Sequence, residues 1–142
     1  ETDIKLQLHK ESDKLANLCN SIAFIKELSD VSWAGVYLKR DGELILGPFQ
    51  GKAACNRIKV GSGVCGTAFK EGRTLVVPDV EKFPGHIACD LMSQSEIVVP
   101  IICNDKKIGV LDLDSYSLNR FNEFDKENLE EIVRLLVESN VF

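Results

Sequence analysis

The chain has 142 residues, of which 44% are hydrophobic and 27% charged, and a formal net charge of -5 at pH 7. Length and composition indicate one soluble globular domain, residues 1–142, with a sizeable core. The negative charge argues against nucleic acid and anionic membranes as partners, and no apolar run approaches the roughly 20 residues of a membrane span. The five cysteines, an odd number without a visible secretory signal, favour a cytoplasmic, reducing location.

The N-terminal third is predicted to form a helix and a β-hairpin. Apolar residues recur at helical spacing in the first segment, where the buried face is expected to comprise Leu15, Leu18, Cys19, Ile22 and Ile25. The hairpin follows, with strands at Trp33–Lys39 and Glu43–Phe49 joined by the turn dipeptide Asp41-Gly42.

A glycine-rich turn, "GSGVCG", then opens a short helix that Gly72 closes. Residues Gly61 to Gly66 match the G-x-G-x-x-G pattern of dinucleotide-binding proteins, which requires a buried strand before it and a full crossover helix after it. Here "NRIKV" is a poor buried strand and the helix is short, so we do not expect a nucleotide site. The turn is either an ordinary helix start or one whose unpaired N–H groups attract an anion.

The C-terminal half contains three further strand-like runs, "TLVVPDV", "SEIVVPIIC" and "KIGVLDLDS", the last two joined at Asn104-Asp105. A final amphipathic helix follows, with Asn122 as its expected N-cap and an apolar stripe of Leu129, Ile132, Val133 and Leu136. Five or six short strands with a helix at each end predict an α/β (α+β) fold with a mainly antiparallel sheet. We expect the terminal helices on one face, and the loops Gly51–Ser62 and Asp79–Ser95 around a site on the other.

An acidic strand is the first candidate for chemistry. Asp112 and Asp114 are two residues apart and therefore point to the same face of a strand. They could form a solvated surface, but the run is apolar like a central strand, where Asp is rare. We therefore expect a cavity that receives a cation or a proton, with Glu96 as a third carboxylate and Trp33 and Tyr37 as an apolar wall.

The cysteines fall into two groups. Cys19 and Cys103 lie in predicted helix and strand and are interpreted as packing residues. Cys55, Cys65 and Cys89 lie in loops or at a helix start, at separations of 10 and 24 that do not resemble the ligand spacing of a zinc site. A redox set, with one nucleophilic thiolate and one or two partners for disulfides, fits them better.

Two of these cysteines have neighbours that suggest how their thiolates form. Cys65 lies near a helix N-terminus, whose dipole is expected to favour its thiolate. Cys89 lies in "FPGHIACD", three residues after His86, a possible proton partner. From the residues alone, the prediction is thiol chemistry beside an acidic pocket.

Six segments between Trp33 and Ser115 together resemble the free methionine-(R)-sulfoxide reductases, enzymes built on a single GAF domain: "WAGVYL", "LGPFQGKAAC", "GSGVCG", "FPGHIACD", "SEIVVP" and "GVLDLDS". The resemblance implies a nucleophile at Cys89 and partner cysteines at Cys65 and Cys55, without saying which of the two resolves first. It also implies substrate contacts from Glu96, Asp112, Asp114, Trp33 and Tyr37.

The implied reaction reduces free methionine sulfoxide without a metal or cofactor. Cys89 becomes a sulfenic acid, a partner thiol closes a disulfide, and thioredoxin reduces it. Glu96 or Asp114 is expected to act as the general acid, because crowding raises the pKa of a carboxyl. The family is commonly dimeric, so a homodimer is expected.

A GAF domain that senses a small molecule or redox state without catalysis is the alternative. Three loop cysteines argue against a pure binder, and incubation with free methionine sulfoxide and a dithiol distinguishes the two, since a sensor yields no methionine.

Overall fold

The computed structural model describes residues 2–142 of the chain. Its elements, in chain order, are α1 (Thr2–Lys10), α2 (Lys14–Lys26), β1 (Trp33–Arg40), β2 (Glu43–Gln50), β3 (Arg57–Lys59), α3 (Gly63–Glu71), β4 (Leu75–Val77), the 3-10 helix η1 (Val80–Lys82), β5 (Ser95–Cys103), β6 (Lys106–Ser115) and α4 (Glu123–Glu138). In the part that begins at Thr2, no helix combines the length and apolar character needed to cross a bilayer.

The six strands form one sheet in the order β3-β2-β1-β6-β5-β4. Every neighbouring pair is antiparallel, as predicted. Asp41 and Gly42 at the β1–β2 turn both have positive φ, 50° and 81°, as do Asn104 and Asp105 at the β5–β6 turn, 51° and 64°. Two central residues at positive φ are what a tight two-residue hairpin requires, which explains why both turn signals were readable in the sequence.

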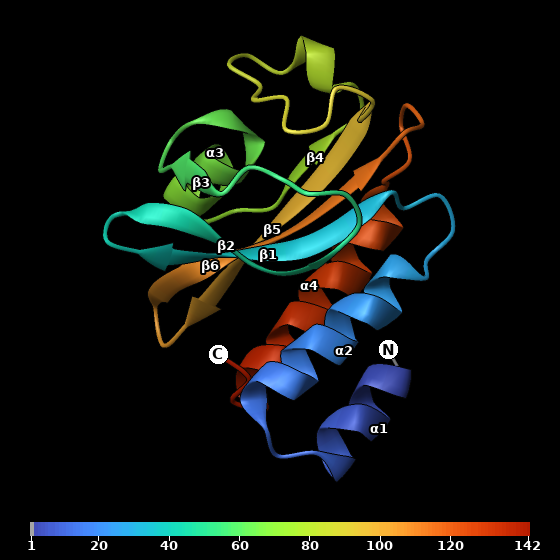
Figure 1. Ribbon diagram of the computed structural model, residues 1–142, viewed down its shortest axis with the longest axis vertical. Coiled ribbons are helices and arrows are strands. Elements are labelled where there is room, and N and C mark those ends of the chain that lie inside the picture. Colours follow the sequence, from blue (N-terminus) through green and yellow to red (C-terminus); the bar gives the residue numbers. More distant parts are fainter. Residues whose placement is uncertain (1) are drawn as a thin grey trace.

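The two faces of the sheet are covered differently (Figure 1). Helices α2 and α4 pack on one face, where Ile22 and Leu136 share a buried core with Val36, Ile97 and Leu113, and α1 packs against α2 farther from the sheet. The other face carries α3 and the long loops, with a second buried core that includes Trp33, Tyr37, Phe69 and Val98. The predicted separation between a helix-covered face and a loop-covered face is therefore confirmed.

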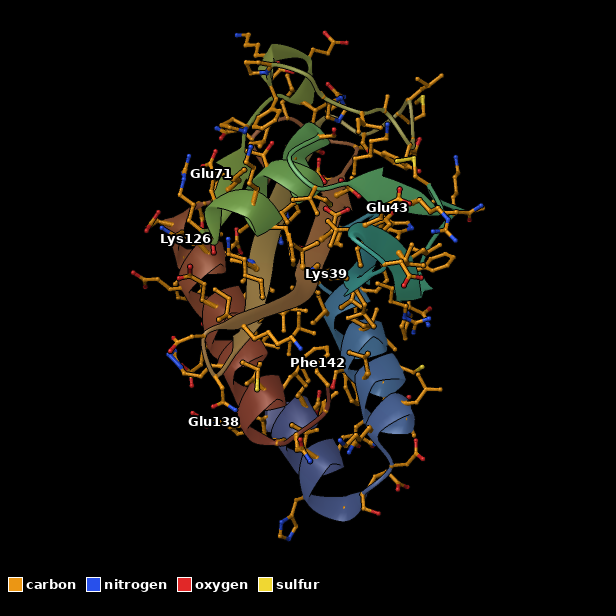
Figure 2. The ribbon with its side chains drawn as sticks, turned by 90° about the vertical axis from the view of Figure 1, so that its left-hand side faces the viewer. Lys39, Glu43, Glu71, Lys126, Glu138 and Phe142 are labelled. Atoms are coloured by element: carbon orange, nitrogen blue, oxygen red, sulfur yellow. A yellow bond between two sulfur atoms is a disulfide. The ribbon has the colours of Figure 1, made fainter. Side chains whose placement is uncertain are left out.

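Helix α1 was not predicted from the sequence. Its Ile4 is 1% exposed and belongs to the core that also contains Leu136 and Val141. Figure 2 shows Glu138 and Phe142 at the end of α4 that lies next to α1. A nine-residue helix with one buried residue gives little periodic signal, so its stability depends on packing against α2 and the end of α4.

The predicted ends of two helices are confirmed. Asn122 is the N-cap of α4, and its side chain and that of Asp125 form a reciprocal capping box. Gly72 caps α3 in the left-handed conformation with φ 67°.

Part of the predicted buried face of α2 was wrong. Leu15 is 62% exposed, because the first turn of α2 extends beyond the sheet (Figure 1), and Cys19 is exposed too. Cys19 is rotated about 100° from the buried Leu18, which places it at the margin of the apolar stripe. Cys103, the last residue of β5, is half-buried beside the hairpin turn, so its packing role is weaker than expected.

Candidate active site

Strand register places the predicted carboxylates and aromatics on one face of the sheet. Trp33 of β1 pairs with Asp114 of β6, and Asp114 pairs with Glu96 of β5. Two residues along the same three strands, Asp112 pairs with Gly35 of β1 and with Val98 of β5. Because paired residues and residues two apart share a face, these side chains converge on the face opposite the terminal helices.

The acidic cluster is withdrawn from water. Glu96 is 6% and Asp112 5% exposed, while Asp114 is half-buried. Burial raises the pKa of Glu96 and Asp114 well above the ordinary range, and the charge of Asp112 adds to this in both. Burial also raises the pKa of Asp112, but hydrogen bonds from Glu96 and Cys65 oppose the rise. Asp112 is therefore the carboxyl best able to stay ionised, and the other two are suited to hold a proton.

Cys65 was predicted to have an activated thiolate, and this was wrong. Its side chain is buried, with Sγ 3.9 Å from Glu96 Oε2. Burial, followed by the charges of Asp112 and Glu96, raises the pKa of the Cys65 thiol well above its usual value. The position near the N-terminus of α3 does not offset desolvation beside carboxylates, so Cys65 is a neutral thiol at physiological pH.

Cys89 and Cys55 form a disulfide, with their Cα atoms 5.4 Å apart. Cys55 lies in the β2–β3 loop and is half-buried, whereas Cys89 lies exposed in the loop between η1 and β5. Of the two partner cysteines that the resemblance implied, the structure pairs Cys55 with Cys89 and leaves Cys65 as a free thiol.

Trp33 and Tyr37 hold the loop that carries Cys55. The Trp33 Nε1–H donates to the Lys52 carbonyl oxygen at 3.0 Å, and the Tyr37 hydroxyl donates to the Cys55 carbonyl oxygen at 2.9 Å. Burial raises the pKa of Tyr37, which keeps the hydroxyl a donor. The two aromatics therefore line the cavity, as predicted, and also position the disulfide.

Glycines allow two close approaches around the site. A Cβ atom on Gly35 would lie 2.5 Å from Phe49 Cβ and 2.6 Å from the Trp33 ring, so only glycine lets that ring fold across β1. Gly63, with φ 64°, begins α3, and a Cβ there would lie 3.1 Å from the Ile87 side chain. The loop of Cys89 thereby rests directly on the start of α3.

The contacts that hold the Cys89 loop were not predicted from the sequence. The Tyr116 hydroxyl donates to Asp90 Oδ2 at 2.9 Å, and the Met92 N–H donates to Asp90 Oδ1 at 2.9 Å. The Met92 N–H, and then the Tyr116 hydroxyl, hold the pKa of Asp90 below its ordinary value. An aspartate bonding the backbone two residues on is an Asx turn, a signal that was readable in the sequence.

These elements enclose a cavity of about 570 Å³, counting the open space at its mouth. Its walls include Ser62, Gly63 and Val64 at the start of α3, and all the predicted site residues except Cys55, which is bonded to the wall residue Cys89. His86 also lines the cavity, with Nε2 4.0 Å from Glu96 Oε1. A role for His86 as the proton partner of Cys89 stays a prediction. Burial lowers the pKa of His86, which favours the neutral imidazole.

The raised carboxyl pKa values predict an unusual pH dependence of stability. Glu96 and Asp114 bind protons more tightly folded than unfolded. Their contribution to stability is therefore complete below the unfolded pKa of about 4 and is lost as pH rises toward the folded pKa. Glu96→Gln should remove this loss and raise Tm at neutral pH by about 4 °C or more, corresponding to at least ~1 kcal/mol.

Thermal unfolding of the disulfide form at acidic and at neutral pH measures this effect. The exposed Glu127→Gln on α4 serves as the matched control and should leave Tm and its pH dependence unchanged. A Glu96→Gln variant that is less stable than the parent at neutral pH would contradict the conclusion that ionisation of buried Glu96 destabilises the fold.

Comparison with known proteins places this chain in a family. Residues 16–138 match the GAF domain family. The free methionine-R-sulfoxide reductase of Saccharomyces cerevisiae (strain ATCC 204508 / S288c) is 50% identical over an alignment of 137 residues, and the match covers 90% of this chain and 76% of the relative. That of Escherichia coli (strain K12) is 47% identical over 135 residues, 94% of this chain and 82% of the relative.

A solved structure agrees with these relatives. The X-ray structure of the free methionine-R-sulfoxide reductase of Neisseria meningitidis, in complex with its substrate, superposes with a TM-score of 0.92 at 46% identity, over 96% of this chain and 83% of that one. The likeness thus extends over nearly the whole chain. The chain belongs to the GAF domain family and, within it, to the family of the free methionine-R-sulfoxide reductases.

Proposed function

We propose that this protein reduces free methionine-(R)-sulfoxide to methionine by thiol chemistry. The observation that carries the proposal is the Cys55–Cys89 disulfide at the wall of a cavity containing Glu96, Asp112 and Asp114. Relatives at 47% and 50% identity are named for this activity. A small zwitterion fits such a cavity better than a peptide does. Its ammonium can pair with the three carboxyls, whereas the neutral amide nitrogen of a peptide would leave them without a cationic partner.

Each part of the substrate has a suitable partner in the cavity. The ammonium group is best placed against Asp112, with Glu96 and Asp114 beside it. The carboxylate fits the unpaired N–H groups at the start of α3, where Gly63 lines the cavity. The apolar methyl group fits against Trp33, which stacks with its neighbours Tyr37 and Phe49.

The reaction then balances in two steps. The Cys89 thiolate attacks the sulfoxide sulfur while Glu96 or Asp114, protonated because its pKa is raised, gives a proton to the oxygen. The S–O bond of the substrate then breaks, the protonated oxygen passes to the Cys89 sulfur as a sulfenic acid, and methionine leaves. The Cys55 thiol attacks this sulfur, water is released, and the disulfide forms.

An external dithiol must return two electrons to the disulfide, and we assign this role to thioredoxin. Thiolate attack on a disulfide requires access to one sulfur. Cys89 is exposed, so a protein dithiol can reach it without unfolding the loop. The reducing cytoplasm is the matching compartment, and the chain is expected to act as a homodimer, which light scattering would measure.

The direct test supplies the reduced protein with free methionine sulfoxide, R and S epimers separately, and either thioredoxin with its reductase or a small dithiol. Methionine formation from the R epimer alone is expected. A GAF domain acting only as a sensor would bind without releasing methionine, and that outcome would overturn the proposal.

Substitution of the two partner cysteines, Cys55 and Cys65, should have different effects in single-turnover experiments. Cys55→Ser should release one methionine per chain and then stall, with steady-state turnover supported by thioredoxin reduced at least ~100-fold, because the observed disulfide cannot form. Cys65→Ser should continue to cycle, because its thiol is buried beside Glu96 and takes no part in that disulfide. Rapid-quench measurement of methionine per chain decides between them, and normal cycling of Cys55→Ser would reject its resolving role.

A further inference from the structure

The inner end of the cavity gathers three atoms of the type that metal ions bind. Cys65 Sγ and one carboxylate oxygen each from Glu96 and Asp112 all lie within 4.8 Å of one another, and all three residues are buried. Three points at such separations have a common centre no farther than about 2.8 Å from each, 4.8 Å divided by √3. Zinc bonds are about 2.3 Å to sulfur and 2.0–2.2 Å to oxygen, so shifts below about 1 Å would complete a site.

An independent observation indicates that this cluster lacks a ligand. Asp112 is 5% exposed and lines the cavity, yet among residues 2–142 no hydrogen-bond donor reaches its Oδ1. A buried oxygen without a partner is destabilising, because it has lost its hydrogen bonds to water without gaining others. A cation bound by the Asp112 carboxylate would give this side chain a partner that the protein itself does not supply to Oδ1.

From this geometry we infer that Cys65, Glu96 and Asp112 form a binding site for a thiophilic divalent cation of the Zn²⁺ class. The sulfur ligand selects against Mg²⁺ and Ca²⁺, which prefer all-oxygen sites. Three protein ligands leave a fourth tetrahedral position for water or for His86, whose Nε2 lies 4.0 Å from Glu96 Oε1. The thiol proton of Cys65 is released to the solvent when the ion binds.

The site has a regulatory consequence. An ion at this position occupies the space in which the proposed function places the substrate ammonium, so metal and substrate exclude one another. The inference itself rests on the geometry of the cluster and not on the proposed activity. Cys55 and Cys89 are not ligands, so the ion binds the disulfide form as well.

The experiment uses the disulfide form of the full chain carrying Cys19→Ser and Cys103→Ser. Of the five cysteines, Cys65 is then the single free thiol. Titration with Zn²⁺ alone, by calorimetry, should show one ion per chain at micromolar concentration. Titration with Co²⁺ alone should produce a thiolate-to-cobalt charge-transfer band.

In that same background, Cys65→Ser and Asp112→Asn are the informative variants. Each should weaken Zn²⁺ binding by more than ~100-fold, beyond the 10–100-fold loss typical of residues that only support ligands, and Cys65→Ser should lose the band. Both replacements are nearly isosteric, and circular dichroism verifies their folding. Absence of saturable binding in the parent, or a band that persists in Cys65→Ser, would overturn the inference. Reductase activity is measured separately with a chelator present. A failure of the proposed reductase function is then distinguishable from a failure of the metal-site inference.

Discussion

Cys89→Ser is expected to lower steady-state reduction of free methionine-(R)-sulfoxide by at least ~1,000-fold, because a serine hydroxyl is not ionised at neutral pH and lacks the nucleophilicity of a thiolate. Cys89 is exposed in its loop, so the substitution leaves no cavity in either core. Its Tm should match that of the reduced parent, in which the Cys55–Cys89 disulfide is also absent. Methionine release with a small dithiol measures the effect without depending on thioredoxin.

A matched control for this experiment is Cys103→Ser, since Cys103 lies at the β5–β6 turn and outside the cavity. It should retain the activity of the parent. Substantial methionine release by Cys89→Ser would place the nucleophile on another thiol. Because Cys65 is the remaining thiol that lines the cavity, Cys65→Ser in the Cys89→Ser background would then identify it.

Acylation of the substrate nitrogen should lower kcat/KM by about 10⁴-fold or more. Free methionine sulfoxide brings an ammonium to Asp112, Glu96 and Asp114, whereas N-acetyl-methionine sulfoxide brings a neutral amide and a bulky substituent. A site built to pair with a group rejects an analogue lacking it by 10⁴–10⁵-fold, because buried polar groups are left unpaired. Assays of the free, N-acetylated and peptide-bound sulfoxides side by side, with epimers separated, measure this ratio.

The carboxyl variants show whether charge or size causes the discrimination. Asp112→Asn should lower kcat/KM for the free substrate by orders of magnitude and narrow the gap between free and acetylated forms, since Asp112 is the carboxyl best able to stay ionised. Comparable rates on the free and acetylated substrates with the parent protein would mean that the three carboxyls do not contact the ammonium.

Local patterns in the sequence determined much of the fold. The two-residue period of a strand placed Asp112 and Asp114 on one face, and β6 has that arrangement, with both residues lining the cavity. The turn at Asp41-Gly42 was readable because few residues adopt positive φ at both central positions. Strand periodicity and turn type depend on residues that are close in the chain, so they can be predicted from one sequence.

The sequence by itself thus determined the antiparallel sheet, its helix-covered face, the acidic strand and the set of cysteines, and its motifs indicated the family. The tertiary structure alone decided that Cys55 rather than Cys65 pairs with Cys89, since Tyr37 holds the Cys55 loop from a strand 18 residues away. It also decided that the Cys65 thiol stays protonated, because its burial beside Asp112 and Glu96 arises only when α3 packs on the sheet. Disulfide choice and pKa depend on distance and desolvation between segments far apart in the chain, and neither is encoded in residue spacing.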